Sequence, residues 1–350
     1  MVVVAGAGMA GLVAAARLRE LGRDVKLLEK GDRAGGSMLL SSGVVWRHRD
    51  FEDFRAECPD AIEALQRLVY DRLDDSLHWL EQAATPAAQR DTGNPRTVGR
   101  RFDPTRLTEA LVRAGGAPEL SRPLDELPDG EVVLATGGFA AKLAREHGLL
   151  LRAAPWSEGD GLRLAADRGA STAGDLDEFY GRALPAPPAQ IGEHDFVRAS
   201  QLYGRFARVV DDDGRPVFDR TPSWSETDLA QAIANQPNGT AWYVLDEAAL
   251  TGRVRDRTVA DMVGVAEELG AEVRREGAQV AVKVAAGITH TLGGLAVDDS
   301  ARVLDRDGEP LDGLYAAGVD VGGIASGGYA SGLAQALVLG LTAAESIAHS

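Results

Sequence analysis

Cysteine is almost absent from this sequence of 350 residues, in which Cys58 is the single example. One thiol excludes an internal disulfide, and it cannot supply a CxxCH haem attachment or an iron–sulfur cluster within this chain. Long apolar runs are missing too, because no stretch approaches the roughly 18 residues of a membrane-spanning helix. Met1 is followed directly by an apolar strand rather than by a signal peptide, so the sequence predicts a cytoplasmic protein.

Positive charge is also scarce. Lys and Arg number 37 against 53 Asp and Glu, which gives a formal net charge of -16. Nucleic acid and anionic membranes both bind to clustered cations, so neither is expected as a partner. The acidic run Asp211–Asp213 lacks the glutamate-containing continuation of a calcium loop, and a hairpin turn at Asp213-Gly214 is the better interpretation. We predict no metal site.

Glycine, in contrast, is plentiful, and its first cluster follows a short apolar strand at Val2–Ala5. Gly6, Gly8 and Gly11 have the spacing G-x-G-x-x-G, which permits a tight turn, close approach of a pyrophosphate and packing of helix on strand. A helix predicted over Leu12–Leu21 would direct its N-terminal N–H groups toward that pyrophosphate. The alternative is a tight strand-turn-helix without a ligand.

An acidic residue follows the next predicted strand at the distance typical of dinucleotide sites. The strand is Val25–Leu28, and Glu29 after it is placed to bind a ribose hydroxyl. The segment Lys30–Gly43 is rich in glycine and serine, which suits a loop lying along a flat, phosphate-bearing cofactor. A flexible surface loop is the alternative, although Met38-Leu39-Leu40 would be unusual on one.

The middle of the chain predicts two different kinds of structure. Phe51–Ala83 has helical periodicity with Asp60 as a candidate cap, Ala84–Arg101 is loop-like, and the run Glu131–Phe139 predicts a strand that enters a glycine turn at Gly137-Gly138. Asp160 is either the N-cap of a helix or a cofactor contact, and local preference favours the cap. From Ala173 to Gly287 the composition changes, which indicates an inserted domain. Strand, glycine loop and helix return after Ile288, so the C-terminal segment is expected to complete the first sheet.

Several motifs in a fixed order give the chain a family resemblance. They are the N-terminal glycines with Glu29, Gly35-Gly36-Ser37, Ser41-Ser42-Gly43, Ala135-Thr136-Gly137-Gly138, Gly159-Asp160-Gly161, His290-Thr291-x-Gly293-Gly294 and Gly313-Leu314-Tyr315-Ala316-Ala317-Gly318. The chain resembles the FAD-dependent fumarate reductase and 3-ketosteroid dehydrogenase flavoproteins of the FAD-binding 2 type, with a shortened section around Ala117–Gly130.

That resemblance implies an α/β fold. A Rossmann-like FAD-binding domain of the glutathione-reductase type would comprise residues 1–172 and 288–350, and a smaller inserted α+β domain at 173–287 would cap the substrate. The cofactor implied is FAD. The residues implied to contact it are Gly6, Gly8, Met9, Ala10, Gly11, Glu29, Lys30, Gly36, Ser37, Ser41, Ser42, Gly43, Ala135, Thr136, Gly137, Asp160, Gly318, Asp320, Gly332, Ala334 and Gln335.

The chain departs from fumarate reductases at the positions of their functional arginines. Tyr329 stands where the resemblance leads one to expect a clamp for the substrate carboxylate, Trp224 where it implies a proton-donating arginine, and Tyr203 where it implies a relay arginine. Three aromatic residues in place of cations disfavour a dicarboxylate pocket. Tyr329-Ala330-Ser331 is instead similar to the Tyr-x-Ser of 3-ketosteroid Δ4-(5α)-dehydrogenases.

The resemblance therefore implies removal of a hydride to flavin N5 and of a proton to a tyrosine, which forms a double bond beside a ketone. Tyr329 and Ser331 are the first catalytic candidates, with Tyr203 or Tyr180 as a second tyrosine. His290 and Trp224 are candidate substrate contacts, and His290 is equally consistent with a structural turn. The expected partners are an apolar ketone and an electron acceptor such as oxygen, a quinone or another protein.

Two alternatives remain from the sequence. A reductase of small unsaturated acids would need a cation, which Arg205, Arg208 or Arg220 could supply. An FAD-binding protein without turnover of its own is the second, because the inserted domain is short.

Overall fold

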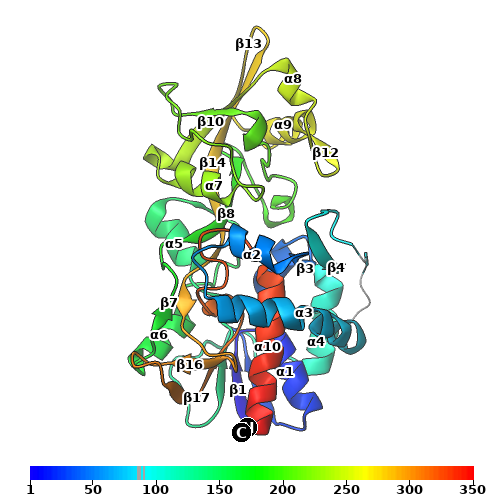
Figure 1. Ribbon diagram of the computed structural model, residues 1–350, viewed down its shortest axis with the longest axis vertical. Helices are drawn as coiled ribbons and strands as arrows, with labels where there is room; N and C mark the ends of the chain where they lie inside the picture. The colour runs from blue at the N-terminus through cyan, green and yellow to red at the C-terminus, as the bar shows by residue number, and fades with distance from the viewer. Residues whose placement is uncertain (85–87, 90) are drawn as a thin grey trace. The chain divides into compact units, whose positions relative to one another are not determined.

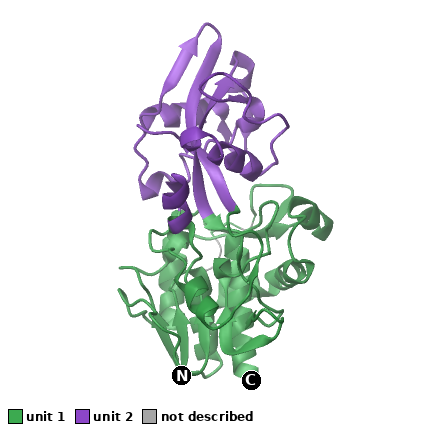
Figure 2. Ribbon diagram, turned by 90° about the vertical axis from the view of Figure 1, so that its left-hand side faces the viewer, with its two compact units in different colours: residues 1–141, 153–178, 290–350 green, residues 142–152, 179–289 purple. Residues whose placement is uncertain are grey.

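The computed structural model describes residues 1–84, 88–89 and 91–350. The chain divides into two compact units, of which unit 1 comprises residues 1–141, 153–178 and 290–350 and unit 2 comprises residues 142–152 and 179–289 (Figure 2). The sequence-based boundaries of the inserted domain were 173 and 287, and residues 142–152 were assigned to the FAD-binding domain. Both termini belong to unit 1.

The central sheet of unit 1 is built from the apolar runs that the sequence marked as strands. Its strand order is β16-β17-β5-β1-β2, with β1, β2, β5 and β17 parallel and β16 antiparallel to β17. The bounds are β1 Val2–Ala5, β2 Val25–Leu28, β5 Val132–Leu134, β16 Arg302–Leu304 and β17 Pro310–Ala316. β1 and β5 are buried along their whole length, as expected of parallel strands covered on both faces.

Helices from both ends of the chain pack together in unit 1. Helix α1 (Met9–Glu20) lies against α10 (Gly332–His349) and against α4 (Pro104–Gly115), as the blue and red ribbons of Figure 1 show. α10 is buried on almost every side, which explains why its sequence is apolar throughout rather than along one stripe. The C-terminal segment thus joins the domain begun by the first strand, as expected.

Two sequence-based assignments in unit 1 were wrong. The predicted helix over 51–83 is two helices, α2 (Phe51–Glu57) and α3 (Glu63–Ala83), because the chain turns through Cys58, Pro59 and Asp60. The N-cap of α3 is Ile62 rather than Asp60. The predicted loop over 84–101 ends in a strand, β4 (Thr97–Arg101), which pairs antiparallel with β3 (Val44–His48). Part of that loop, residues 85–87 and 90, lies outside the described residues.

Short elements complete unit 1. They are η1 Gly36–Leu40, α6 Asp160–Asp167, β7 Thr172–Ala173, β15 Gly294–Leu295 and η5 Gly318–Asp320, while α5 (Ala140–His147) continues from unit 1 into unit 2. The N-cap of α6 is Gly159 rather than Asp160, which occupies the first helical position. Met38 and Leu40 of η1 are buried, so this segment is not an exposed surface loop.

Unit 2 is arranged around one long strand, β14 (Gln279–Thr291), whose last residues reach into unit 1. β10 and β13 pair with it antiparallel, β9 pairs with β10, β6 is parallel to β14, and β8 also pairs with β14. The bounds are β6 Leu150–Leu151, β8 Phe179–Pro185, β9 Arg208–Val210, β10 Thr240–Leu245, β11 Arg253–Val254, β12 Arg257–Thr258, β13 Val273–Glu276, η2 Glu193–Asp195, η3 Gly204–Phe206, η4 Pro237–Gly239, α7 Thr227–Ala234, α8 Glu247–Leu250 and α9 Val259–Glu268. Sheet and helices together make it an α+β unit. The turn at Asp213-Gly214 is confirmed by an Asp211 N to Arg215 O bond.

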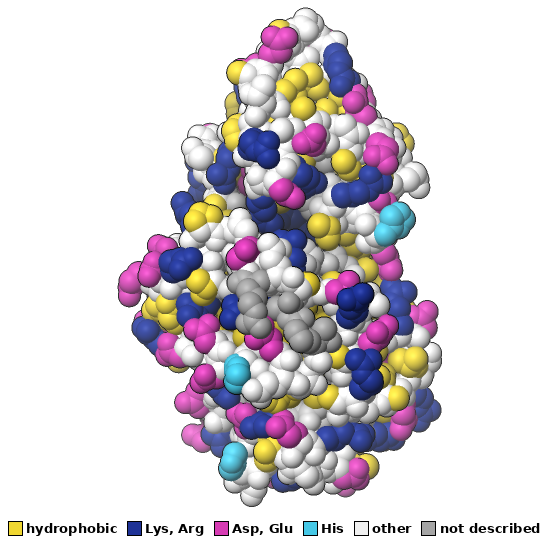
Figure 3. Space-filling view, turned by 90° about the vertical axis from the view of Figure 1, so that its right-hand side faces the viewer, with side chains coloured by type: hydrophobic (Ala, Val, Ile, Leu, Met, Phe, Trp, Pro, Cys, Tyr) yellow, Lys and Arg dark blue, Asp and Glu magenta, His cyan; other side chains and the backbone are white. Residues whose placement is uncertain are grey.

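The surface carries both signs of charge, and acidic and basic side chains alternate over the face in Figure 3. Within the described part of the chain, none of the helices combines the length and apolarity needed to cross a bilayer. The same residues contain no grouping of three or more His, Cys, Asp or Glu side chains able to hold a metal ion.

Candidate functional site

The three glycines of the turn between β1 and α1 have the different surroundings that their spacing predicts. A Cβ on Gly11 would lie 1.8 Å from the carbonyl oxygen of Gly6, and one on Gly6 (φ 104°) would lie 2.1 Å from that of Ala135. These two glycines are therefore required by packing. A Cβ on Gly8, in contrast, would meet nothing within 4 Å, so the backbone there faces open space.

Open backbone at Gly8 adjoins the start of a helix that no side chain caps. α1 has no side-chain cap hydrogen bond and no acidic residue in its first turn, which contains Met9, Ala10 and Gly11. Uncapped N–H groups and the helix dipole favour an anion at this end. The turn has the open space and the donors that a pyrophosphate requires.

Glu29 is tied to this turn by its carboxylate. One oxygen accepts a hydrogen bond from Ala7 N at 2.7 Å and the other from Gly31 N at 2.7 Å, and the side chain is buried. Each carboxylate oxygen can accept a further bond. Glu29 thus fixes the turn and still has acceptor capacity for a ribose hydroxyl.

Asp320 joins the second glycine loop to the C-terminal segment. Its buried carboxylate accepts hydrogen bonds from Thr136 N, from Thr136 Oγ1 at 3.0 Å and from Gly138 N at 2.9 Å. Burial raises the pKa of Asp320, against the opposing effect of these donors. Both predicted FAD contacts, Thr136 and Asp320, therefore lie together and hold each other.

Further predicted cofactor residues also meet in unit 1. Lys30 Nζ lies 2.7 Å from Asp160 Oδ2, and Ser37 Oγ accepts a hydrogen bond from Ala154 N at 2.9 Å. Gly36 follows Gly35, which pairs with Gly8 as an isolated bridge. Ser41 Oγ accepts from Gly43 N at 3.0 Å, whereas Ser42 is exposed.

The start of α10 carries the remaining predicted cofactor residues of unit 1. Gln335 Nε2 donates to the carbonyl oxygens of Gly318 (2.8 Å) and Val321 (3.0 Å), which holds η5 against the helix. Ala334 is buried in the first turn, and Gly332 is half-buried. A Cβ on Gly332 would lie 3.2 Å from His290 Cε1, so the His290 ring stands directly against the helix start.

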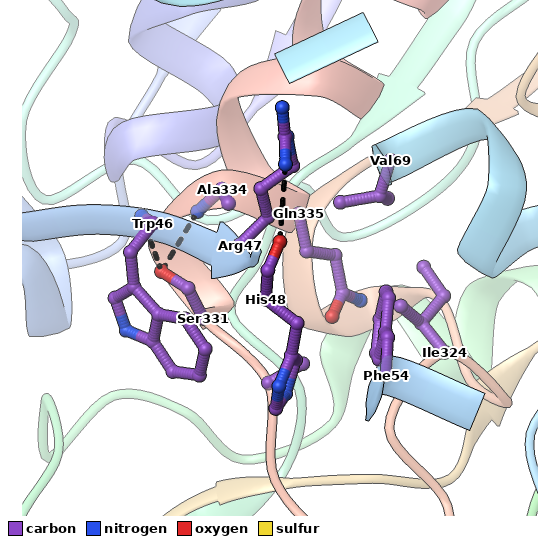
Figure 4. A pocket seen from close by; sticks show the side chains of 10 residues that line it. Trp46, Arg47, His48, Phe54, Val69, Ile324, Ser331, Ala334 and Gln335 are labelled. Atoms are coloured by element: carbon purple, nitrogen blue, oxygen red, sulfur yellow. Dashed lines mark hydrogen bonds between the residues drawn. The ribbon is translucent and has the colours of Figure 1, made fainter. Parts of the chain in front are cut away.

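Ser331 connects α10 to strand β3. Its Oγ accepts hydrogen bonds from Ala334 N (3.2 Å) and Trp46 N (3.4 Å), as Figure 4 shows. Its hydroxyl donates to the carbonyl oxygen of Val44 at 3.4 Å. Ser331 is therefore the N-cap of α10, a position that serine favours.

Tyr329 lies two residues before this cap, beside an aromatic wall. Its half-buried ring is 5.3 Å from the ring of Trp46, which is 5.4 Å from that of His48, and His48 stacks on Phe54 at 5.3 Å. Trp46, His48 and Phe54, together with Val69, line a cavity of about 10 Å³, enough for about one water molecule (Figure 4). A cavity this small cannot hold a ring-sized organic molecule.

Residues 1–124 and 126–332 match the FAD binding domain family. The chain belongs to that family.

Its cofactor is accordingly FAD, and the open backbone at Gly8 and the uncapped start of α1 fit the pyrophosphate of that cofactor. The curated relatives of this FAD-binding protein are named as reductases or oxidoreductases, and the chain is an oxidoreductase of the same family. A probable fumarate reductase of Shewanella frigidimarina is 24% identical over an alignment of 419 positions, gaps included, and the alignment covers 92% of this chain and 70% of that protein.

Solved structures share the fold. The open conformation of a flavocytochrome c3 fumarate reductase matches with a TM-score of 0.73 and 22% identity, over 100% of this chain and 78% of the other. A 3-ketosteroid-Δ4-(5α)-dehydrogenase from Rhodococcus jostii RHA1 matches with a TM-score of 0.70 and 20% identity, over 99% and 96%. The predicted fold class is thereby confirmed.

The remaining sequence candidates of this FAD-binding protein lie in unit 2. Tyr203 has no exposed surface, its hydroxyl donates to Gln201 Oε1 at 2.7 Å, and burial raises its pKa. Tyr180 is a buried residue of β8, with the Arg182 guanidinium 5.0 Å from its ring centroid. Trp224 is half-buried in the segment before α7.

Three residues that contact Tyr329 in the structure, Trp46, His48 and Cys58, were not predicted as site residues. No motif marks them, because they contact Tyr329 only through the fold. The run Val44-Val45-Trp46 has the β-branched and aromatic composition typical of a strand, and it was the one available signal.

Proposed function

We propose that this FAD-dependent oxidoreductase acts on a carbon–carbon bond next to a ketone, in a flat apolar substrate of the 3-ketosteroid kind. The observation that carries the proposal is the place of Tyr329, on the loop that enters α10, with the Trp46 ring beside it and the His290 ring at the same helix start. Aromatic rings at this point suit an apolar ring system better than a dicarboxylate.

FAD, when bound, supplies the acceptor for the hydride that leaves the substrate. In this mechanism Tyr329 acts as its phenolate, which takes the proton from the carbon next to the ketone and becomes the neutral phenol, because that C–H is the acidic one. The N-terminal end of α10 favours negative charge nearby through its dipole. Ser331 keeps this end in place through the N-cap bond, and as the partner of Tyr329 it is our second catalytic candidate.

Unit 2 is proposed to cap the substrate. Tyr180 and Trp224 are its candidate substrate contacts, and His290 in unit 1 is a third. Tyr203 remains a candidate second tyrosine, although its complete burial means that catalysis by its hydroxyl would require unit 2 to open.

The test is anaerobic mixing of the FAD-loaded protein with saturated and unsaturated 3-ketosteroids, followed by the visible flavin band. We expect bleaching with a saturated 3-ketosteroid, and a rate lower by about 10²–10⁴-fold in Tyr329→Phe, the range for losing a general acid–base group. A matched control is Tyr315→Phe, which removes a buried tyrosine hydroxyl from β17. Full turnover by Tyr329→Phe would remove Tyr329 from the mechanism, and an inert spectrum with every donor would favour an FAD-binding protein without turnover.

A reductase of small unsaturated acids is the second candidate, and the fumarate reductases among the relatives favour it. The arginines that the sequence offered for the substrate carboxylate, Arg205, Arg208 and Arg220, are all exposed, and Arg220 lies 3.7 Å from Asp228. Reoxidation of the reduced protein by fumarate, with no bleaching by ketosteroids, would support this candidate.

A further inference from the structure

Two buried side chains hold the main chain of Tyr329. The imidazole of His48 on β3 hydrogen-bonds to the Tyr329 main chain, and so does the thiol of Cys58 at the end of α2. The bond to Tyr329 acts to raise the pKa of His48, as a bond donated by the imidazole to the Tyr329 carbonyl does. The bond to Tyr329 acts to lower the pKa of Cys58, as a bond donated by the Tyr329 N–H to Cys58 Sγ does. The exposed fractions of His48 and Cys58 are 2% and 0%.

The glycines before Tyr329 press the same loop against α2. A Cβ on Gly328 would lie 1.7 Å from the carbonyl oxygen of Glu57 and 3.3 Å from Cys58 Sγ, so only glycine permits this approach. Gly327 has a φ of 84°, and its N–H donates to Glu178 Oε1 at 2.7 Å. The segment that carries Tyr329 is therefore anchored on both sides, by α2 before the tyrosine and by the Ser331 cap after it.

The aromatic wall holds the two side chains in turn. Phe54 stacks on the His48 ring with an interplanar angle of 18°, and Trp46 lies between His48 and Tyr329. His48 thus contacts the Tyr329 carbonyl directly, and its ring contacts the Trp46 ring that in turn packs on the Tyr329 ring. No other part of the mechanism described above uses His48 or Cys58.

The protonation states suit this task. Burial raises the pKa of the Cys58 thiol, which keeps sulfur protonated and unreactive, as a weak acceptor for an N–H group. Burial lowers the pKa of the His48 imidazole, which keeps it neutral with a single ring N–H to donate. Neither residue has the exposure that contact with a substrate would need.

We propose that His48 and Cys58 are positioning residues, which fix the backbone of Tyr329 so that its hydroxyl stays at one place beside the α10 start. The catalytic part of this inference rests on the proposed function. The structural part, an ordered Tyr329 that depends on His48 and Cys58, does not. Positioning of this kind matters because a displacement of about 1 Å at a reacting group can lower a rate by about 10²-fold.

The first measurement is independent of activity. All six tyrosines are labelled with 3-fluorotyrosine in the FAD-loaded protein, and the ¹⁹F signal missing from Tyr329→Phe identifies Tyr329. We expect this signal to broaden or split in His48→Phe, which keeps a ring and loses the donor, and in Cys58→Ala, which loses the acceptor. In Cys58→Ser, whose hydroxyl still accepts the N–H, we expect one sharp signal.

The control is Val69→Ala, which removes a side chain from the same small cavity without touching Tyr329. It should leave the Tyr329 signal sharp. An unchanged Tyr329 signal in both His48→Phe and Cys58→Ala, with FAD bound and the fold intact, would overturn the inference. If His48→Phe does not fold, the comparison of Cys58→Ala with Cys58→Ser decides alone.

The second measurement separates the inference from the proposed function. With a 3-ketosteroid donor we expect kcat to fall by about tenfold to hundredfold in Cys58→Ala, with KM and FAD affinity unchanged, and to recover in Cys58→Ser. A changed ¹⁹F signal without turnover on any ketosteroid refutes the proposed function and leaves the positioning of Tyr329 supported. Equal losses of kcat in Cys58→Ala and Val69→Ala would refute the positioning role in catalysis.

Discussion

Replacing Glu226 by Gln should remove a loss of stability that unit 2 suffers as the pH rises. Glu226 precedes α7 with a φ of 55°, its side chain is 4% exposed, and its Oε1 lies 3.4 Å from Arg205 N. Burial raises its pKa from the ordinary 4.5 to about 7, against the opposing effects of the Arg182 guanidinium and the N–H groups of Gly204 and Arg205. The folded state therefore binds this proton more tightly than the unfolded state does.

The sign and size of the effect follow from that difference. For a carboxyl group whose pKa is higher in the folded state, stability is full below the unfolded pKa near 4.5 and is lost as the pH rises to about 7. At about 1.4 kcal/mol for each pH unit, the loss amounts to about 3 kcal/mol. Glu226→Gln does not titrate, so it should match the parent protein near pH 5 and exceed it by up to about 3 kcal/mol near pH 8.

Hydrogen exchange of the α7 and β10 segments measures the opening free energy of unit 2 at these two pH values. Comparison of variant and parent at the same pH cancels the titration of all other groups. Glu276→Gln, which replaces an exposed carboxylate on β13 of the same unit, is the control and should show no such difference. A gap between parent and Glu226→Gln that stays constant from about pH 5 to about pH 8 would refute the reasoning.

Three further predictions concern unit 1. Gly8→Ala should change the stability of the FAD-free protein by no more than about 0.5 kcal/mol and weaken FAD binding, because the added Cβ meets open space where FAD binds. Gly11→Ala should destabilise the FAD-free protein itself, because the added Cβ meets the Gly6 carbonyl. Urea unfolding measures the two stabilities, and FAD titration measures the affinity of Gly8→Ala. Ser331→Ala should cost about 1 kcal/mol of stability by removing the α10 cap, with Ser331→Thr retaining most of it, and an unchanged unfolding midpoint would contradict the assigned cap. Asp320→Asn should cost about 1–3 kcal/mol and loosen the loop after β5, since an amide cannot accept all the bonds that the carboxylate accepts; unchanged exchange at Thr136 and Gly138 would contradict this.

Local patterns were sufficient wherever the chain's neighbours in sequence are also its neighbours in space. The strands at 2–5 and 25–28 and the helix after the glycine turn were predicted correctly, because apolar runs and turn glycines act over a few residues. β4 was missed because its polar sequence forms a strand only by pairing with β3, which lies far earlier in the chain at Val44–His48. The break between α2 and α3 was marked only by the candidate cap at Asp60, because the helical spacing of apolar residues continues across it.

The sequence by itself determined the cofactor class, a dinucleotide, because the glycine turn that binds the pyrophosphate is a local structure. Gly6, Gly8 and Gly11 lie within one turn, and their backbone conformation follows from their spacing. Only the tertiary structure decided what surrounds Tyr329. Trp46, His48 and Cys58 come from β3 and the end of α2. They meet Tyr329 because α10 packs against β3 and the loop before α10, at Gly328, lies against the end of α2. Such contacts depend on the burial of side chains between elements far apart in the chain, and no spacing in the sequence encodes them.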